Sequence, residues 1–363
     1  MRVLLVDPSS HGGIALYTAL LARALVAAGA EPTVLGSRSL PAGPERYEVR
    51  RVLPRLDWGR PDDAGARFYL RRAVGWVASA VAVEALALKR RPGVIHFQAP
   101  LNRRLDARLV RLARRTAPVA WTAHDVLPFD RTDADRDRFA AIYRAANLVL
   151  VHSAAAADEL QQLSGVEPQV IDHVAPRPVV DPDRLEARRR LGLPAEGRIL
   201  AALGFVRRYK RYGLLADVWE ELGTAAPLLL VLGEVLDESE RPELERLERT
   251  GRAVIRPSYA SEEDLQLAVV AADALLLPYE TSSESGLLHQ ARALGVPVLS
   301  SDAPQLATSV RATEAGRVVT GGVEAWAAAV TEPLPSPPPA PASPEETGRK
   351  HLEAYGLARV RRR

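Results

Sequence analysis

The chain has 363 residues, of which 47% are hydrophobic and 26% are charged, and its formal net charge is +3. This length favours two domains over one small binding module, and the composition excludes a disordered or collagen-like chain. The chain has no cysteine, which excludes disulfides, thiolate nucleophiles and cysteine-ligated metal centres. The small net charge gives no indication of nucleic-acid binding.

Short apolar runs, each bounded by turn residues, are separated by helical patterns along the chain. They cover residues 3–6, 94–97, 119–122, 148–151, 199–204, 228–233 and 274–278. Continuous apolar strands that alternate with helices are typical of a parallel sheet buried on both faces. The sequence therefore predicts an α/β fold of two doubly wound, Rossmann-like domains that face each other across a cleft, where ligands are expected.

The alternation pauses at residues 175–184, where three prolines block regular structure. We expect one domain over residues 1–178 and another over 179–344. Residues 333–344 read as a proline-rich tether, and residues 345–363 as a terminal helix that packs back on the first domain. The run at 3–6 is too short for a signal-peptide core, and the stretch 73–88 is too short for a membrane span. The sequence therefore predicts a cytoplasmic protein.

The segment after the first apolar run places Gly12 and Gly13 directly before a helical pattern. Two glycines let a backbone approach a ligand closely, and a helix N-terminus offers free N–H groups to a phosphate. The GxGxxG dinucleotide fingerprint is absent. A tight turn that binds nothing is the alternative.

Two further segments follow apolar strands. His124 comes directly after the strand at 119–122, where an imidazole can orient a sugar hydroxyl, although a lone histidine is more often structural. The strand at 199–204 leads into Arg207, Arg208, Lys210 and Arg211, which can neutralise a diphosphate. A solvated basic loop is the competing interpretation of that run.

A serine- and glycine-rich segment follows the strand at 274–278. Its Ser285 and Gly286 open a helix whose N–H groups can hold phosphate oxygens, and Gln290 lies about one turn further on. Two Asp-x-Asp pairs, at 133–135 and 181–183, have the spacing of a divalent-ion site. Helix capping explains these aspartates equally well, and we expect no bound metal.

Together these motifs resemble the GT-B glycosyltransferases, and within them the retaining glycosyltransferase family 4. The resemblance covers nearly the whole chain, in the order HGG, VIHFQ, TAHD, GFVRRYKR, PYETSSESGLL and GVPV. It implies an acceptor-binding first domain and a second domain that binds the nucleotide sugar. Gly12 and Gly13 would lie at the donor diphosphate or the acceptor, and His124 would contact the donor sugar.

The resemblance assigns Arg207 and Lys210 to the diphosphate, together with backbone N–H groups around Gly286, Leu287 and Leu288. The family's Glu-x7-Glu motif falls on Ser282 and Gln290, so neither carboxylate is present at the matching position. Gln290 can still hydrogen-bond a ribose hydroxyl, and Glu280 or Glu284 can replace the first carboxylate. The donor would be a UDP- or GDP-linked sugar, with no further cofactor, for a hexosyltransferase of the kind used in polysaccharide biosynthesis.

The resemblance also implies retention of the anomeric configuration, and a glycan, lipid-linked or small-molecule acceptor. Two basic helical patterns bear on that acceptor. Residues 67–91 have an apolar middle between basic ends, which favours a peripheral contact with an anionic membrane at its inner face. In residues 101–115 arginines and leucines form separate stripes, and an ordinary surface helix with its leucines on the core is favoured there.

Two other functions fit the same sequence. A sugar-nucleotide epimerase would isomerise or hydrolyse the donor without an acceptor. A non-catalytic GT-B subunit of a transferase complex, suggested by the two missing glutamates, would bind the donor without turning it over.

Overall fold

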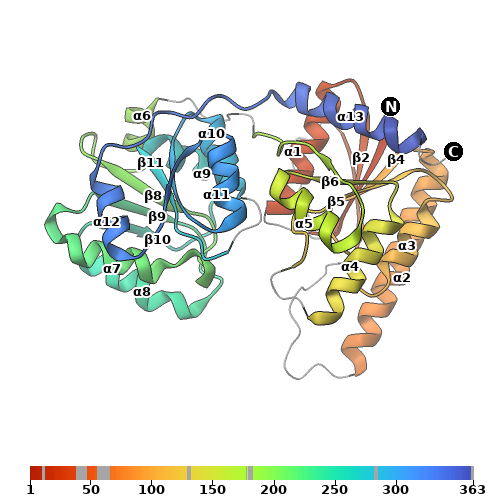
Figure 1. Cartoon of the computed structure of the whole chain (residues 1–363), viewed down its shortest axis with the longest axis horizontal. Coiled ribbons are helices and arrows are strands. Elements are labelled where there is room, and N and C mark those ends of the chain that lie inside the picture. Colours follow the sequence, from red (N-terminus) through yellow and green to blue (C-terminus); the bar gives the residue numbers. More distant parts are fainter. Residues whose placement is uncertain are drawn as a thin grey trace. The chain divides into compact units, whose positions relative to one another are not determined.

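The computed structural model describes residues 1–9, 13–37, 47–54, 66–128, 132–176, 178, 183–281 and 285–360. These residues form two compact units. Unit 1 comprises Met1–Val174 together with Ala342–Arg363, and unit 2 comprises Ala175–Pro341. Each unit is an α/β structure built on one parallel sheet (Figure 1).

Unit 1 contains a seven-stranded sheet in the order β3-β2-β1-β4-β5-β6-β7. Its strands are β1 (Arg2–Asp7), β2 (Glu31–Ser37), β3 (Glu48–Leu53), β4 (Val94–Phe97), β5 (Val119–Thr122), β6 (Leu148–Val151) and β7 (Gln169–Val170). Its helices are α1 (Gly13–Ala27), α2 (Ala66–Arg90), α3 (Asp106–Ala113), α4 (Asp133–Ala145), α5 (Ala154–Ser164) and α13 (Pro344–Val360).

Unit 2 contains a six-stranded sheet in the order β10-β9-β8-β11-β12-β13. Its strands are β8 (Ile199–Leu203), β9 (Leu228–Leu232), β10 (Ala253–Arg256), β11 (Ala274–Leu277), β12 (Val298–Ser301) and β13 (Gly316–Val319). Its helices are α6 (Arg184–Arg190), α7 (Tyr212–Leu222), α8 (Arg241–Arg249), α9 (Glu262–Ala271), α10 (Gly286–Ala293), α11 (Pro304–Ala312) and α12 (Val323–Thr331), with 3₁₀ turns η1 (Arg208–Lys210), η2 (Gly223–Ala225) and η3 (Glu238–Glu240).

The strand order reverses once in each sheet, between β1 and β4 in unit 1 and between β8 and β11 in unit 2. This is the doubly wound arrangement predicted from the apolar runs, and each of those runs is a strand. Ligands of such sheets bind beyond the carboxyl ends of the strands at the point of reversal. In unit 2 a ligand is therefore expected at the loops after β8 and β11.

Both faces of each sheet are covered, because alternate residues of a strand point to opposite sides. In β1, Leu4 and Val6 belong to one buried apolar cluster, and Val3 and Leu5 belong to another. The second cluster contains residues of α1 and α13, whereas α2, α3 and α4 supply the first, on the other side of the sheet (Figure 1). The continuous apolar runs in the sequence result from this burial on two sides.

The terminal helix α13 is an integral part of unit 1. Gly348 of α13 lies so close to α1 that a Cβ there would stand 2.2 Å from the carbonyl oxygen of Ala24. Further along α13, His351 and Tyr355 are fully buried. Tyr355 Oη lies 2.7 Å from Nδ1 of His96, whose Nε2 lies 2.7 Å from Oγ1 of Thr122 at the end of β5. A hydrogen-bonded chain therefore joins α13 to the strand that precedes His124.

His351 makes the second polar connection between α13 and the rest of unit 1. Its Nδ1 lies 2.8 Å from the carbonyl oxygen of Thr347, so that nitrogen carries the proton. In the neutral imidazole Nε2 is then an acceptor, and the Tyr17 hydroxyl of α1, 3.3 Å away, donates to it. Burial lowers the pKa of His351 to about 4 and holds the pKa of His96 well below its usual value.

These lowered pKa values predict that acid destabilises unit 1. The unfolded chain binds protons at these histidines below about pH 6.5, whereas the folded chain does so only near the lower folded pKa. The free energy of unfolding should therefore fall as pH drops from 7 towards 5, by about 1.4 kcal/mol per pH unit for each such histidine. Asp106 opposes this effect, because burial raises its pKa to about 7. Below that pH the folded chain binds a proton at Asp106 that the unfolded chain does not bind, which cancels the contribution of about one histidine.

Urea unfolding at pH 7, 6 and 5 measures the slope, and His351→Gln isolates one contributor because it leaves Asp106 and His96 in place. The variant should be less stable at pH 7 and lose less stability on acidification than the wild-type protein. Equal slopes for the two proteins would contradict the assignment of a proton-free imidazole at position 351.

Candidate functional site

In unit 2 the carboxyl end of β8 leads into the basic loop. Gly204 has φ +77°, a conformation that favours glycine, and a Cβ there would lie 3.2 Å from Nζ of Lys210 and 3.6 Å from Cδ1 of Leu287. The loop after β8 and the first turn of α10 therefore meet at Gly204. Gly233, after β9, is also required, because a Cβ there would stand 2.1 Å from the Gly204 carbonyl oxygen.

Lys210 is the buried cation of this loop. Its side chain is 7% exposed, and Nζ donates to the carbonyl oxygen of Leu203 at 2.6 Å. Nζ also stands 5.5 Å from the ring centroid of Tyr279, within range of a cation–π contact. Burial, with a smaller effect from the Arg207 charge, lowers the pKa of Lys210 to about 7. An anion placed beside Nζ would stabilise the charged form and raise that pKa.

Arg207 and Arg208 have different surroundings although they are adjacent. Arg207 is exposed and forms no ion pair with any residue that the structure describes. Arg208 interacts with the carboxylate of Asp237, whose pKa is lowered by hydrogen bonds from Ser239 and, more weakly, by Arg208. Arg211 has φ +56° and directly precedes α7 as its N-cap residue. Of the basic residues in the loop, Arg207 is thus available to a ligand next to Lys210, whereas Arg208, which is also exposed, lies near the carboxylate of Asp237.

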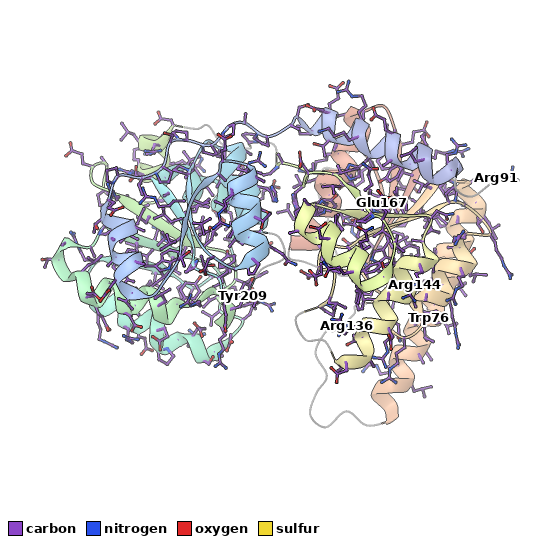
Figure 2. All side chains as sticks on the ribbon, in the orientation of Figure 1. Trp76, Arg91, Arg136, Arg144, Glu167 and Tyr209 are labelled. Atoms are coloured by element: carbon purple, nitrogen blue, oxygen red, sulfur yellow. The ribbon has the colours of Figure 1, made fainter. Side chains whose placement is uncertain are left out.

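The segment after β11 is joined to the basic loop through its backbone and two aromatic rings. The Glu280 N–H donates to the carbonyl oxygen of Tyr209 at 2.7 Å. The rings of Tyr209 and Tyr279 meet edge-on with centroids 5.5 Å apart, and Figure 2 labels Tyr209 in this loop. Ser301 of β12 donates from Oγ to the Tyr279 carbonyl oxygen at 2.5 Å. The strand order thus brings together segments about 70 residues apart in sequence.

The N-terminus of α10 presents backbone N–H groups at the same place. Ser285 precedes the helix but does not cap it, because its side chain hydrogen-bonds to Tyr279. No described atom lies within 4 Å of a Cβ built on Gly286, so packing does not require a glycine there. Leu287 is partly buried beside Gly204, and the side chain of Leu288 is in the core. The first turn of α10 can therefore accept an anion.

Gln290 is 2% exposed, one turn into α10. Its amide oxygen has no hydrogen-bond partner among the residues that the structure describes. A buried acceptor without a partner is costly, and a ligand hydroxyl group would relieve that cost.

In unit 1, His124 lies just beyond β5. Its Nε2 donates to Oε1 of Gln98, which follows β4, at 3.4 Å. The Tyr17 ring of α1 packs edge-on against the imidazole, with centroids 4.6 Å apart. Burial, and to a smaller extent His152, keeps the pKa of His124 well below its usual value. At neutral pH the side chain is therefore an uncharged imidazole that can share a proton in a hydrogen bond.

Two further histidines belong to the same group, and sequence reasoning did not identify them. His152 directly follows β6, with its ring centroid 5.4 Å from that of His124, and His173 follows β7, 5.2 Å from His152. The sequence did contain a pattern that could have identified them, because each histidine follows the end of a short strand. Parallel strands end at one edge of the sheet, so these histidines are expected to lie close together. Tyr279 was likewise missed as the ring beneath Lys210.

The structure brings Arg207, Lys210, Gly286, Leu287 and Gln290 together in unit 2. It places His124 in unit 1, at the carboxyl edge of that sheet, and Gly13 in unit 1 as the first residue of α1. Gly12, Ser282 and Glu284 lie outside the described residues.

Two of the four aspartates considered for a metal ion, Asp135 and Asp183, act as helix caps. Asp135 accepts hydrogen bonds from Thr132 at the start of α4 and pairs with Arg138. Asp183 caps α6 by accepting from the N–H groups of Leu185 and Glu186. Asp181 lies outside the described residues. Within the part of the chain that the structure describes, no group of three or more metal-ligating side chains occurs.

Two glycosyltransferase family domains match the sequence. Residues 11–184 match Glycosyltransferase Family 4, and residues 197–334 match Glycosyl transferases group 1. The two matches leave residues 1–10, 185–196 and 335–363 uncovered. No curated protein matches the sequence.

Solved structures with the same fold cover nearly the whole chain. Anabaena HepE in complex with UDP and glucose aligns with a TM-score of 0.64 and 16% identity, over 100% of this chain and 94% of that one. Sucrose-phosphate synthase from Thermosynechococcus elongatus gives 0.68 and 20%, over 99% and 96%. The catalytic domain of Arabidopsis thaliana starch synthase IV, bound to ADP and acarbose, gives 0.69 and 12%, over 99% of both chains.

The fold of each unit, the two domain matches and these alignments agree. The chain is a GT-B glycosyltransferase that carries a Glycosyltransferase Family 4 domain followed by a Glycosyl transferases group 1 domain.

Proposed function

We propose that this enzyme transfers a hexose from a UDP- or GDP-linked sugar to a hydroxyl group of a glycan, lipid-linked or small-molecule acceptor, with retention at the anomeric carbon and without a metal ion. The observation that carries the proposal is the buried Lys210 ammonium beside the exposed Arg207, at the uncapped N-terminus of α10. These groups supply positive charge where a diphosphate leaving group needs it.

In the proposed reaction the bond between the anomeric carbon and the diphosphate oxygen breaks as the acceptor oxygen bonds to that carbon from the same face. The acceptor hydroxyl then lies beside the departing oxygen, which takes its proton. Lys210, Arg207 and the first-turn N–H groups of α10 stabilise the developing charge on the diphosphate. Gln290 offers its amide oxygen to a ribose hydroxyl group, and His124 offers a neutral imidazole to the donor sugar.

A lipid-linked acceptor would involve the membrane. The proposal includes a cytoplasmic location with peripheral contact between the inner face of an anionic membrane and residues 67–91 and 101–115. None of the described helices is long and apolar enough to cross a bilayer.

The competing functions differ in their products. Incubation with UDP- and GDP-sugars, with and without EDTA, should release nucleoside diphosphate in both conditions. An epimerase would convert the donor sugar without an acceptor, and a non-catalytic subunit would bind the donor without turnover.

Removing either cation should slow transfer with little loss of fold stability. Arg207→Ala and Lys210→Met should each lower kcat by about a hundredfold or more, because each removes charge stabilisation from the leaving group. Arg208→Ala is the matched control, since Arg208 faces Asp237, and its turnover should stay within about threefold of wild type. Wild-type turnover in both test variants, measured by diphosphate release, would disprove this role.

Gly13 and Gly286 provide a separate test of backbone approach to the donor. Each begins a helix, and a Cβ would meet no described atom within 4 Å, so alanine should leave the melting temperature unchanged or slightly raised. If the donor lies against Gly286, Gly286→Ala should weaken its binding by about tenfold or more. Gly13→Ala should weaken donor or acceptor binding to a similar extent.

The control for both variants is Gly356→Ala, an open position on the exposed side of α13. It should bind donor as the wild type does. Unchanged donor affinity in Gly286→Ala, measured by calorimetry, would show that the first turn of α10 is not the phosphate site.

A further inference from the structure

The exposed face of α2 is apolar over most of its length. Between Arg72 and Lys89 every residue classed as exposed is alanine, valine or leucine: Ala73, Val74, Val77, Ala78, Val81, Ala85 and Leu88. The larger side chains are more than half exposed, with 60% for Val74, 54% for Val77, 62% for Val81 and 66% for Leu88. Together with Leu70, at 64%, these residues form what we call the α2 stripe.

The α2 stripe recurs at intervals of three and four residues, which places it on one side of the helix. At 1.5 Å per residue it is about 27 Å long. The opposite side of α2 carries Ala80, Val83 and Ala87, which are buried in the core of unit 1. The helix therefore has its own core-facing side, and the stripe is additional apolar surface that the described residues of unit 1 leave exposed.

Polar residues of α2 are turned away from the stripe. Glu84 accepts a hydrogen bond from Thr116, and Trp76 donates its indole N–H to Asp106 of α3. Figure 2 labels Trp76 on α2 and Arg91 just beyond its C-terminal end. A contiguous exposed apolar surface with its polar residues kept to one side marks an interaction site.

Both ends of the α2 stripe are basic. Arg71 is exposed at the N-terminal end, and Lys89 and Arg91 are exposed at the C-terminal end. Arg104 just before the neighbouring helix α3, and Arg108 and Arg111 on that helix, are exposed, and their side chains form no hydrogen bond or ion pair with any described residue. Its Leu109 is buried and Leu105 partly buried, as in the core-facing alternative, while Leu112 is 42% exposed. α3 is also shorter than the expected 101–115, since it runs from Asp106 to Ala113.

This charge pattern selects among the partners that could cover the stripe. Two copies of α2 packed together would place basic ends against basic ends in either orientation, which costs energy. An anionic bilayer surface accommodates both features, because apolar side chains enter the interface while lysine and arginine contact phosphates. We propose that α2 lies in the surface of an anionic lipid bilayer, with the α2 stripe inserted and the arginines of α3 beside it on the headgroups.

This inference deepens the proposed function by identifying which face of residues 67–91 enters the bilayer, and it rests on that function for its link to a lipid-linked acceptor. Vesicle binding needs no sugar transfer, so either proposal can fail while the other holds. The chain contains no cysteine, so one introduced thiol gives a site-specific probe.

The full-length protein should sediment with vesicles of phosphatidylglycerol and phosphatidylcholine in equal parts, and much less with phosphatidylcholine alone. Val77→Asp combined with Val81→Asp should weaken that binding by tenfold or more, because two charges then enter the interface. Leu185→Asp combined with Leu357→Asp carries the same charge change at exposed leucines on α6 and α13, and should bind as the wild type does. Melting temperatures should match in all three proteins.

An environment-sensitive fluorophore on Ala78→Cys should brighten and shift to the blue with the anionic vesicles, whereas the same label on Ala225→Cys should not change. Three results would overturn the proposal: no sedimentation with anionic vesicles, equal binding by the Val77→Asp, Val81→Asp protein, or an unchanged Ala78 label on bound protein. A dimer that dissociates in the Val77→Asp, Val81→Asp variant, without vesicle binding, would assign the stripe to a second copy.

Discussion

A lysine ammonium buried at the carboxyl end of β8 is the interaction on which the geometry of unit 2 depends. Lys210 donates to the Leu203 carbonyl oxygen and lies near the Tyr279 ring, and these contacts only partly replace the water lost on burial. Gly204 leaves space beside the ammonium, and Gly233 lets β9 approach Gly204. The lowered pKa of Lys210 reflects the free-energy cost of burying the charge that these contacts do not offset. A bound diphosphate would repay that cost, which explains why a cation is kept at a buried position.

In unit 1 the polar side chains near the carboxyl edge of the sheet are imidazoles and tyrosines in place of a buried cation. The imidazoles of His124, His152 and His173 gather where β5, β6 and β7 end and pack against the Tyr17 ring. From α13, His351 hydrogen-bonds to Tyr17, and Tyr355 to His96 of β4. The last helix in the sequence therefore helps to fix the polar edge of the first sheet, which links the intact C-terminal helix to the state of His124. The two units thus present different chemistry at their carboxyl edges: cations and helix N–H groups in unit 2, and a group of imidazoles that includes the neutral His124 in unit 1.

Seven strands buried on both faces were predictable, because burial requires a continuous apolar run, as in β1, β8 and β11. The buried strands β2 and β12 were not predicted, because proline, glycine and serine interrupt their apolar runs. The edge strands β3, β10 and β13 were not, since their half-exposed positions tolerate the arginines and glutamate that break such runs. Arg207 and Lys210 were predicted from their place after a strand. The Tyr279 ring under Lys210 was not, because that contact depends on β8 lying next to β11, a pairing that local sequence does not encode.

The central claim is that Lys210 receives the diphosphate, and proton linkage tests it most directly. With a pKa of about 7, Lys210 is mostly neutral at about pH 8 in the free protein and should become charged when the anion binds. Calorimetry of UDP and GDP binding in buffers of different ionisation enthalpy should then show uptake of close to one proton by the wild-type protein and none by Lys210→Met. Equal affinity and equal proton uptake in the two proteins would contradict the account.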